Sequence, residues 1–182
     1  MTNCEQDIDL WNAFLKDDRE ALGKLFALYY STLYQYGIKI CQDTSIAEDA
    51  IQELFIDLWQ KKTPPPLLSV KAYLLQAIKF KLYKNFRNTK ETTSFDEKNE
   101  QVFELSHLSF LIAQEEDTQK GRRILNALNQ LAPRQKEVIY LKIYKELSYE
   151  EVSSIMQINY QVVRNLLCQA LKNLRNLVVV NV

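Results

Sequence analysis

The sequence predicts an all-α protein with two helical domains joined by a flexible, polar linker. Glycine and proline are scarce, with three and four residues in a chain of 182. A low content of these residues favours long helices over a turn-rich sheet protein. Apolar residues recur at intervals of three and four on both sides of a central stretch rich in Asn, Thr, Ser and acidic residues. This period indicates half-buried helices, and the polar stretch between them indicates a linker.

The N-terminal domain is expected over residues 1–90. Its first helix is predicted over residues 18–40, where apolar and aromatic side chains follow the helical period. Ser45 and Glu48 then have the spacing of a capping box, in which each side chain accepts a hydrogen bond from the other residue's backbone N–H. They predict the start of a second helix, which carries its apolar residues along one face to residue 59.

Three consecutive prolines at 64–66 must end this second helix, because proline lacks the N–H that continues the hydrogen-bond ladder. Ser69 is the expected N-cap of a third helix that reaches residue 87. The acidic linker follows over residues 91–116, with a weakly indicated helical stretch at 102–112.

The C-terminal domain is expected over residues 117–182, and its first helix ends near Leu131. Pro133 suits the first turn of the next helix, predicted to extend to residue 144. Ser148 and Glu151 form a second capping box, opening a short helix that ends before a turn at residues 157–159.

The last helix is predicted over residues 160–177, with Asn159 as its cap. A capped helix, a three-residue turn and a longer second helix have the spacing of a helix-turn-helix. The polar positions expected to face outward are Tyr160, Gln161, Arg164, Asn165 and, further along, Lys172. Arginine and glutamine can read base edges in the major groove, and lysine suits phosphates. A three-helix bundle that touches no DNA is the alternative.

The total charge is zero, yet the charges are segregated along the chain. Lys and Arg number six against eleven Asp and Glu in residues 1–62, six against none in 63–90, one against eight in 91–117, and ten against four in 118–182. Two basic segments separated by acidic ones suit a protein with two nucleic-acid contact regions. Random clustering on solvated helix faces is the alternative.

Two helices carry further candidate surfaces. On the second helix Asp49, Gln52 and Glu53 share one polar face opposite the apolar residues, which indicates a docking surface for a basic partner or a plain solvated face. The third helix interleaves basic and aromatic side chains, which can contact phosphates and unpaired bases. The alternative for that helix is a plain amphipathic one. Its candidate residues are Tyr73, Lys79, Lys81, Lys84 and Arg87.

Several classes of protein are excluded on simple grounds. No apolar run reaches the length of a membrane span, and the N-terminus is polar and acidic, which argues against a secretory signal. Cys4, Cys41 and Cys168 form no CxxC pair, and with the lone His107 they suggest no metal site. No nucleophile–base pair or phosphate loop is visible, so we expect neither an enzyme nor a cofactor or small-molecule substrate. A reduced, cytoplasmic location is expected.

The ordered set of these segments resembles the extracytoplasmic-function sigma factors of the sigma-70 family over nearly the whole chain. The run from Asp49 to Trp59 is similar to region 2.2, which docks on the β′ clamp helices of core RNA polymerase. The resemblance implies that Asp49, Gln52, Glu53 and Phe55 bind the polymerase. The third helix is similar to regions 2.3 and 2.4, which melt and read the minus-ten element.

Residues from Leu128 to Val152 look like the start of region 4, whose helix-turn-helix reads the minus-thirty-five element. The family usually works under an anti-sigma factor, so promoter DNA, core polymerase and such a factor are the expected partners. Phe80 and Lys84 replace the Asn and Asp that are usual in region 2.3, and Glu146 stands where a glycine is common. Because of these departures, the promoter sequence typical of the family is not assigned to this chain.

Two other functions fit the residues without the resemblance. A stand-alone helix-turn-helix regulator would bind specific DNA tightly without polymerase. A helical interaction protein that sequesters a partner would support no transcription.

Overall fold

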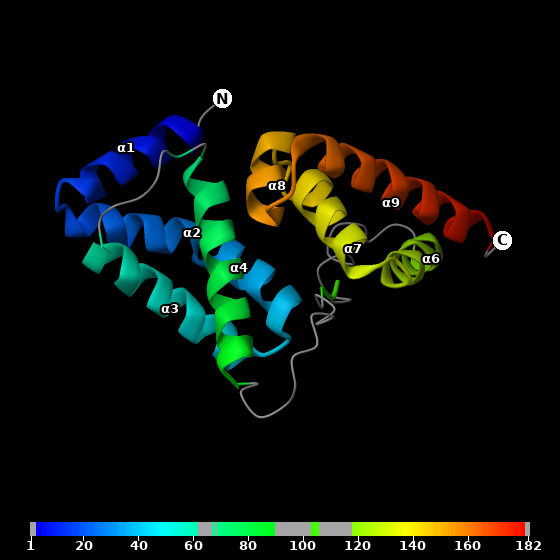
Figure 1. Cartoon of the computed structure of the whole chain (residues 1–182), viewed down its shortest axis with the longest axis horizontal. Helices are drawn as coiled ribbons and strands as arrows, with labels where there is room; N and C mark the ends of the chain where they lie inside the picture. The colour runs from blue at the N-terminus through cyan, green and yellow to red at the C-terminus, as the bar shows by residue number, and fades with distance from the viewer. Residues whose placement is uncertain (1–2, 62–66, 68, 90–102, 106–117, 181–182) are drawn as a thin grey trace. The chain divides into compact units, whose positions relative to one another are not determined.

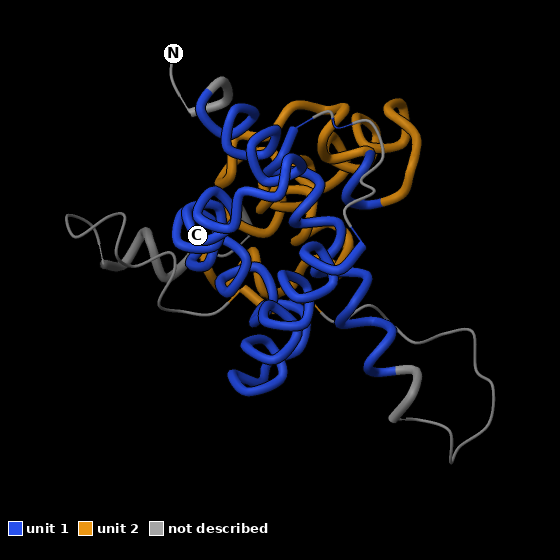
Figure 2. Tube along the Cα trace, turned by 90° about the vertical axis from the view of Figure 1, so that its left-hand side faces the viewer, with its two compact units in different colours: residues 1–97, 154–156 blue, residues 98–153, 157–182 orange. Residues whose placement is uncertain are grey.

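The computed structural model describes residues 3–61, 67, 69–89, 103–105 and 118–180, and every regular element in these ranges is helical (Figure 1). The prediction of an all-α fold is therefore confirmed. The chain divides into two compact units, Met1–Glu97 with Ser154–Met156 and Lys98–Ser153 with Gln157–Val182 (Figure 2). Most of the predicted linker lies outside the described residues, so its boundaries stay a prediction.

The first unit is a bundle of α1 (Asn3–Leu15), α2 (Arg19–Cys41), α3 (Thr44–Lys61) and α4 (Val70–Thr89). Helix α2 packs against each of the other three, and α4 also packs against α1 and α3. The side chains that fill the centre of this bundle are fully buried: Phe14, Leu25, Leu33, Tyr36, Ile51, Leu74, Leu75, Ile78 and Leu82. Each helix buries one stripe and leaves the opposite face exposed, as the apolar period predicts.

Helix α1 was not among the predicted helices. Its Trp11 and Phe14 are buried, and the Trp11 ring lies edge-on to Phe14 with centroids 5.3 Å apart. The hydroxyl of Tyr29 in α2 donates a hydrogen bond to the buried Asp7 carboxylate, which ties α1 to α2. The spacing of Leu10, Trp11 and Phe14 was the available signal, but acidic neighbours dilute it over a single short helix.

Of the two helix caps predicted in the first unit, one is confirmed and one is wrong. Ser69 caps α4 as expected, since its hydroxyl accepts a hydrogen bond from the N–H of Ala72 at 3.0 Å. At α3, however, the predicted capping box of Ser45 and Glu48 is wrong. The carboxylate of Asp43 accepts from the N–H of Ile46 at 3.0 Å, so Asp43 is the cap. An acidic residue two positions earlier performs the same task because α3 starts at Thr44.

The second unit contains α6 (Thr118–Asn129), α7 (Pro133–Ile139), η1 (Tyr140–Tyr144), α9 (Tyr160–Val180) and α8 (Tyr149–Met156) as far as Ser153. Helix α9 packs against α6 and α7.

Pro133 begins α7, as predicted from its missing N–H. The predicted helix over residues 134–144 is not α-helical throughout, because its last five residues form the π-helical turn η1.

Residues 103–105 are described as an irregular segment of the second unit. They are not helical, so the weakly indicated helix at 102–112 is not found where it can be tested, and its other residues lie outside the described part. Phe103 and Leu105 are buried, whereas Glu104 is exposed.

The cap of α3 gives a direct test. We expect Asp43→Ala to lower the free energy of unfolding by about 1 kcal/mol, because a backbone N–H loses its side-chain acceptor. Ser45→Ala is the matched control, and it should change the free energy by less than about 0.5 kcal/mol. Urea unfolding of the full chain, followed by circular dichroism, measures both. Equal losses at the two positions would contradict the assignment of the cap.

Candidate functional site

The predicted helix-turn-helix consists of α8 and α9 joined by the turn at residues 157–159. Both hydrogen bonds of the capping box are present, from Ser148 N–H to Glu151 at 2.8 Å and from Glu151 N–H to Ser148 at 3.1 Å. The side chain of Asn159 accepts from the N–H of Val162 at 2.8 Å. These predictions are confirmed: the capping box fixes where α8 begins, and Asn159 fixes where α9 begins.

The start of α9 presents a polar surface. Gln161, Arg164 and Asn165 are exposed, while Val163, Leu167 and Ala170 are buried on the opposite side. The Gln161 amide donates to the Asn165 side chain at 3.0 Å, one helical turn away.

An aromatic ring lies beside this polar surface. The Arg164 guanidinium lies 5.9 Å from the ring centre of Tyr160, which in turn packs 5.5 Å from the ring of Tyr149 in α8. Lys172 is exposed further along α9. The groups that can read base edges, Gln161, Arg164 and Asn165, therefore lie exposed at the start of this helix, and Lys172 lies further along it.

Helix α3 also separates polar from apolar side chains. Asp49, Gln52 and Glu53 are exposed, as expected from the helical period. Phe55 is different, because it is 7% exposed and its ring lies edge-on to Phe26 of α2 at 5.0 Å. The structure thus places Phe55 in the core of the first unit, where it supports the α3 surface from behind.

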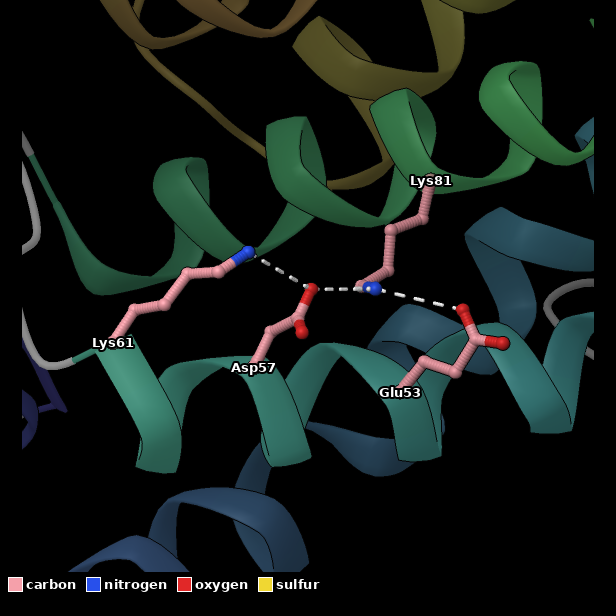
Figure 3. A network of polar contacts seen from close by, with 4 residues as sticks. All are labelled: Glu53, Asp57, Lys61 and Lys81. Atoms are coloured by element: carbon pink, nitrogen blue, oxygen red, sulfur yellow. Dashed lines mark hydrogen bonds and ion pairs between the residues drawn. The ribbon is translucent and has the colours of Figure 1, made fainter.

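An ion-pair network joins α3 to α4 (Figure 3). The Lys81 ammonium of α4 lies 2.8 Å from Asp57 and 3.5 Å from Glu53, both in α3, and Lys61 lies 3.7 Å from Asp57. The hydrogen bond from Lys81, together with the charges of Lys81 and Lys61, holds the pKa of Asp57 below its usual value. The Lys81 side chain is 17% exposed, so it points to these carboxylates and offers little charge to a nucleic acid.

The other candidates on α4 lie in different environments. Tyr73 is half-buried and edge-on to Trp11 at 5.4 Å, and burial raises the pKa of its hydroxyl. Lys79 is buried, with its ammonium 5.8 Å from the ring centre of Tyr83. Lys84 is exposed, and the side chain of Arg87 lies outside the described residues. The sequence-predicted set is therefore not one continuous surface.

Phe80 was not among the predicted site residues. It is 64% exposed, more than any other large apolar side chain in the described part of the chain. Such an exposed ring on a basic helix suits stacking on an unpaired base. The departure from the family pattern at this position was the signal that could have identified it.

The described residues contain no group of three or more His, Cys, Asp and Glu that could hold a metal ion. No helix in the same part of the chain is long and apolar enough to cross a membrane.

Comparison with known proteins identifies both units by sequence. The family model described as "Sigma-70 region 2" matches residues 25–92, and the model "Sigma-70, region 4" matches residues 121–174. The first match contains α3 and α4 with their ion-pair network, and the second contains the helix-turn-helix. No curated protein matches the sequence.

Two solved structures share the fold. The chain is similar to CnrH, solved in complex with the cytosolic domain of CnrY, with a TM-score of 0.63 and 17% identity over 97% of this chain and 99% of that one. It is also similar to the sigma factor RpoE of Bartonella quintana, solved with the anti-sigma factor NepR. Here the TM-score is 0.58, with 21% identity over 88% of this chain and 98% of that one.

The two family models match in the order in which sigma factors carry these regions, and each coincides with helices whose polar faces are exposed. The chain therefore belongs to the sigma-70 family, as a sigma factor that acts in transcription initiation.

Proposed function

We propose that this sigma factor docks on core RNA polymerase through α3 and reads two promoter elements, one with α4 and one with α9. The observation that carries the proposal is the exposed row of Gln161, Arg164 and Asn165 at the capped start of α9. In a helix-turn-helix this end of the second helix enters the major groove. We assign it to the duplex minus-thirty-five element.

Polymerase docking is assigned to Asp49, Gln52 and Glu53. Their exposure on one face of α3 gives an acidic surface suited to the β′ clamp helices of the polymerase. Buried Phe55 and Leu58 hold the opposite face of α3 in the bundle, so the acidic face has a rigid support. Lys81 partly neutralises the charge of Glu53. Asp49 and Gln52 are therefore the part of this acidic surface that is more available to a partner.

Single-stranded minus-ten DNA is assigned to the exposed part of α4. Phe80 supplies a ring for stacking and Lys84, one turn later, supplies charge for the phosphates. Lys81 is assigned to α3 instead of DNA, because a lysine held by two carboxylates must break those contacts to reach a phosphate. Tyr73 and Lys79 are assigned mainly to packing, because the first is half-buried and the second buried.

An anti-sigma factor is proposed as a regulatory partner. RpoE was solved with the anti-sigma factor NepR, and the similarity of fold makes the same kind of partner available to this chain. Such a factor would compete with polymerase for α3. We expect no catalytic step by the chain itself, since its proposed task is recognition.

Charge reversal tests the docking surface. Glu53→Lys should reduce binding to core polymerase at least about tenfold, because a like charge replaces attraction at the interface. Asp9→Lys makes the same charge change at an exposed position of α1 and is the control. Binding is measured by fluorescence anisotropy of the labelled full chain, with circular dichroism to verify folding. Equal affinities for the two variants would refute the assignment to α3.

The two kinds of DNA contact on α9 are separable. Arg164→Ala should cost about 1–3 kcal/mol of promoter affinity and relax the preference at one base pair, because arginine reads base edges. Lys172→Ala should instead weaken all sequences alike and lower the salt slope of binding by about 1. Both are measured with reconstituted holoenzyme on a minus-thirty-five library. If Arg164→Ala lowered the affinity for all sequences alike, Arg164 would contact the DNA backbone and not a base edge.

The lysines of α4 form a matched pair. Lys84→Gln should lower the slope of log affinity against log salt by about 0.7 on open promoter DNA, because one phosphate contact is lost. Lys81→Gln should leave that slope unchanged and lower the free energy of unfolding by up to about 1 kcal/mol, because its carboxylate partners are 41% and 56% exposed and water screens the ion pairs. If Lys81→Gln lowered the salt slope and Lys84→Gln did not, Lys81 and not Lys84 would be the residue that contacts DNA.

A further inference from the structure

Four side chains of the second unit form a row of contacts that ends at Arg164. The Lys142 ammonium of η1 lies 4.7 Å from the ring centre of Tyr149 in α8. The Tyr149 ring packs 5.5 Å from the ring of Tyr160, the first residue of α9, with 59° between the ring planes. The Arg164 guanidinium lies 5.9 Å from the centre of the Tyr160 ring. The row therefore connects η1 to the exposed arginine that is assigned to base recognition.

Each contact in this row favours one orientation of the groups that make it. A cation is attracted to the face of an aromatic ring within about 6 Å, and tilted rings attract at centre distances of about 4.5–7 Å. The ammonium of Lys142 is itself held, because it donates a hydrogen bond to the Leu147 carbonyl oxygen at 2.7 Å. The capping box at Ser148 fixes the backbone directly before Tyr149. Tyr149 is thus held at its backbone and at its ring, and it gives Tyr160 a fixed neighbour.

The position of Tyr160 suits a role beyond packing. Its side chain is 41% exposed, so it buries less apolar surface than a core ring does. An exposed arginine samples many rotamers, and ordering it at the moment of binding costs affinity. A second pair on the same helix has the same spacing of one turn, since the Gln161 amide donates to the Asn165 side chain at 3.0 Å. The side chains at the start of α9 are therefore already arranged in the chain by itself.

We infer that Tyr160 is a positioning residue for Arg164, and that Lys142 and Tyr149 act through Tyr160 to hold the guanidinium in the orientation that reads one base pair. The inference rests on the proposed function of α9. The sequence predicted that Tyr160 contacts DNA itself, whereas here its ring acts through Arg164. The contact uses the aromatic face and not the hydroxyl. Phenylalanine should therefore replace Tyr160 without loss, and leucine, which is apolar but has no aromatic face, should not.

Base preference measures the effect of the ring on Arg164. Holoenzyme with Tyr160→Leu should lose about two- to fivefold of its preference at the base pair that Arg164→Ala relaxes, because an exposed contact between a cation and a ring contributes roughly that much. Tyr160→Phe should keep the wild-type preference. At the other base pairs of the minus-thirty-five element both variants should match the wild type. Relative affinity across a library of that element is the readout. An unchanged preference in Tyr160→Leu, or equal losses with leucine and phenylalanine, would overturn the inference.

A double variant decides whether Tyr160 acts through Arg164. In the Arg164→Ala background, Tyr160→Leu should cause no further loss of preference, because the group that it positions is gone. A further loss would mean that the ring contacts DNA directly, contrary to the inference. If Arg164→Ala itself relaxed no base pair, the proposed function of α9 would be refuted, and base reading by the row with it. Whether Tyr160 holds Arg164 would still be decided by a measurement without DNA.

Nuclear magnetic resonance of the full chain is that measurement. Protons over the face of an aromatic ring are shifted upfield by its ring current. The side-chain protons of Arg164 should therefore resonate upfield of ordinary arginine values in the wild type and in Tyr160→Phe, and at ordinary values in Tyr160→Leu. Tyr149→Leu should move them part of the way back, because Tyr160 loses its neighbour. Tyr144→Leu is the matched control, since its ring in η1 is 42% exposed and lies outside the row, and it should leave them unchanged. Ordinary arginine values in the wild type would contradict the inference.

Discussion

The burial of α2 among the other helices of the first unit is the constraint on which its functional surfaces depend. Leu25, Leu33 and Tyr36 are fully buried, so α3 and α4 must each turn an apolar stripe toward α2. An α-helix has 3.6 residues per turn, and the orientation of one stripe therefore fixes the opposite face. Asp49, Gln52 and Glu53 are exposed for this reason, and so is Phe80.

Charge adds specificity to this framework more than stability. Lys81 bridges α3 and α4 through Asp57 and Glu53, yet the two carboxylates are 41% and 56% exposed, and ion pairs screened by water contribute only about 0–1 kcal/mol. Their effect is to decide which charges remain available to a partner. Although the net charge of the chain is zero, its charges are segregated, so α3 has an acidic exposed face while α4 and α9 carry the exposed cations Lys84, Arg164 and Lys172. Acidic segments oppose nonspecific attraction to DNA, which suits the proposed dependence of promoter binding on polymerase.

Local hydrogen bonds determine where the helix-turn-helix begins and turns. The capping box of Ser148 and Glu151 and the cap at Asn159 involve residues within three positions of one another. Glu146 and Gln157 have positive φ values of 56° and 53°, a conformation that favours glycine. The glycine common in the family before the helix-turn-helix thus has a physical reason, and Glu146 adopts the same backbone at a cost.

The sequence by itself determined the features that arise from neighbours along the chain: the periods of α2, α3, α4 and α9, three of the four caps discussed above, and the family to which both units belong. Tertiary structure decided the rest. Trp11 and Phe14 make α1 a helix of the bundle, and Lys81 faces α3. The Phe103–Leu105 segment joins the second unit through α7 and η1. Each of these outcomes depends on residues distant in sequence, and local periodicity contains no information about which face of another helix a side chain will meet.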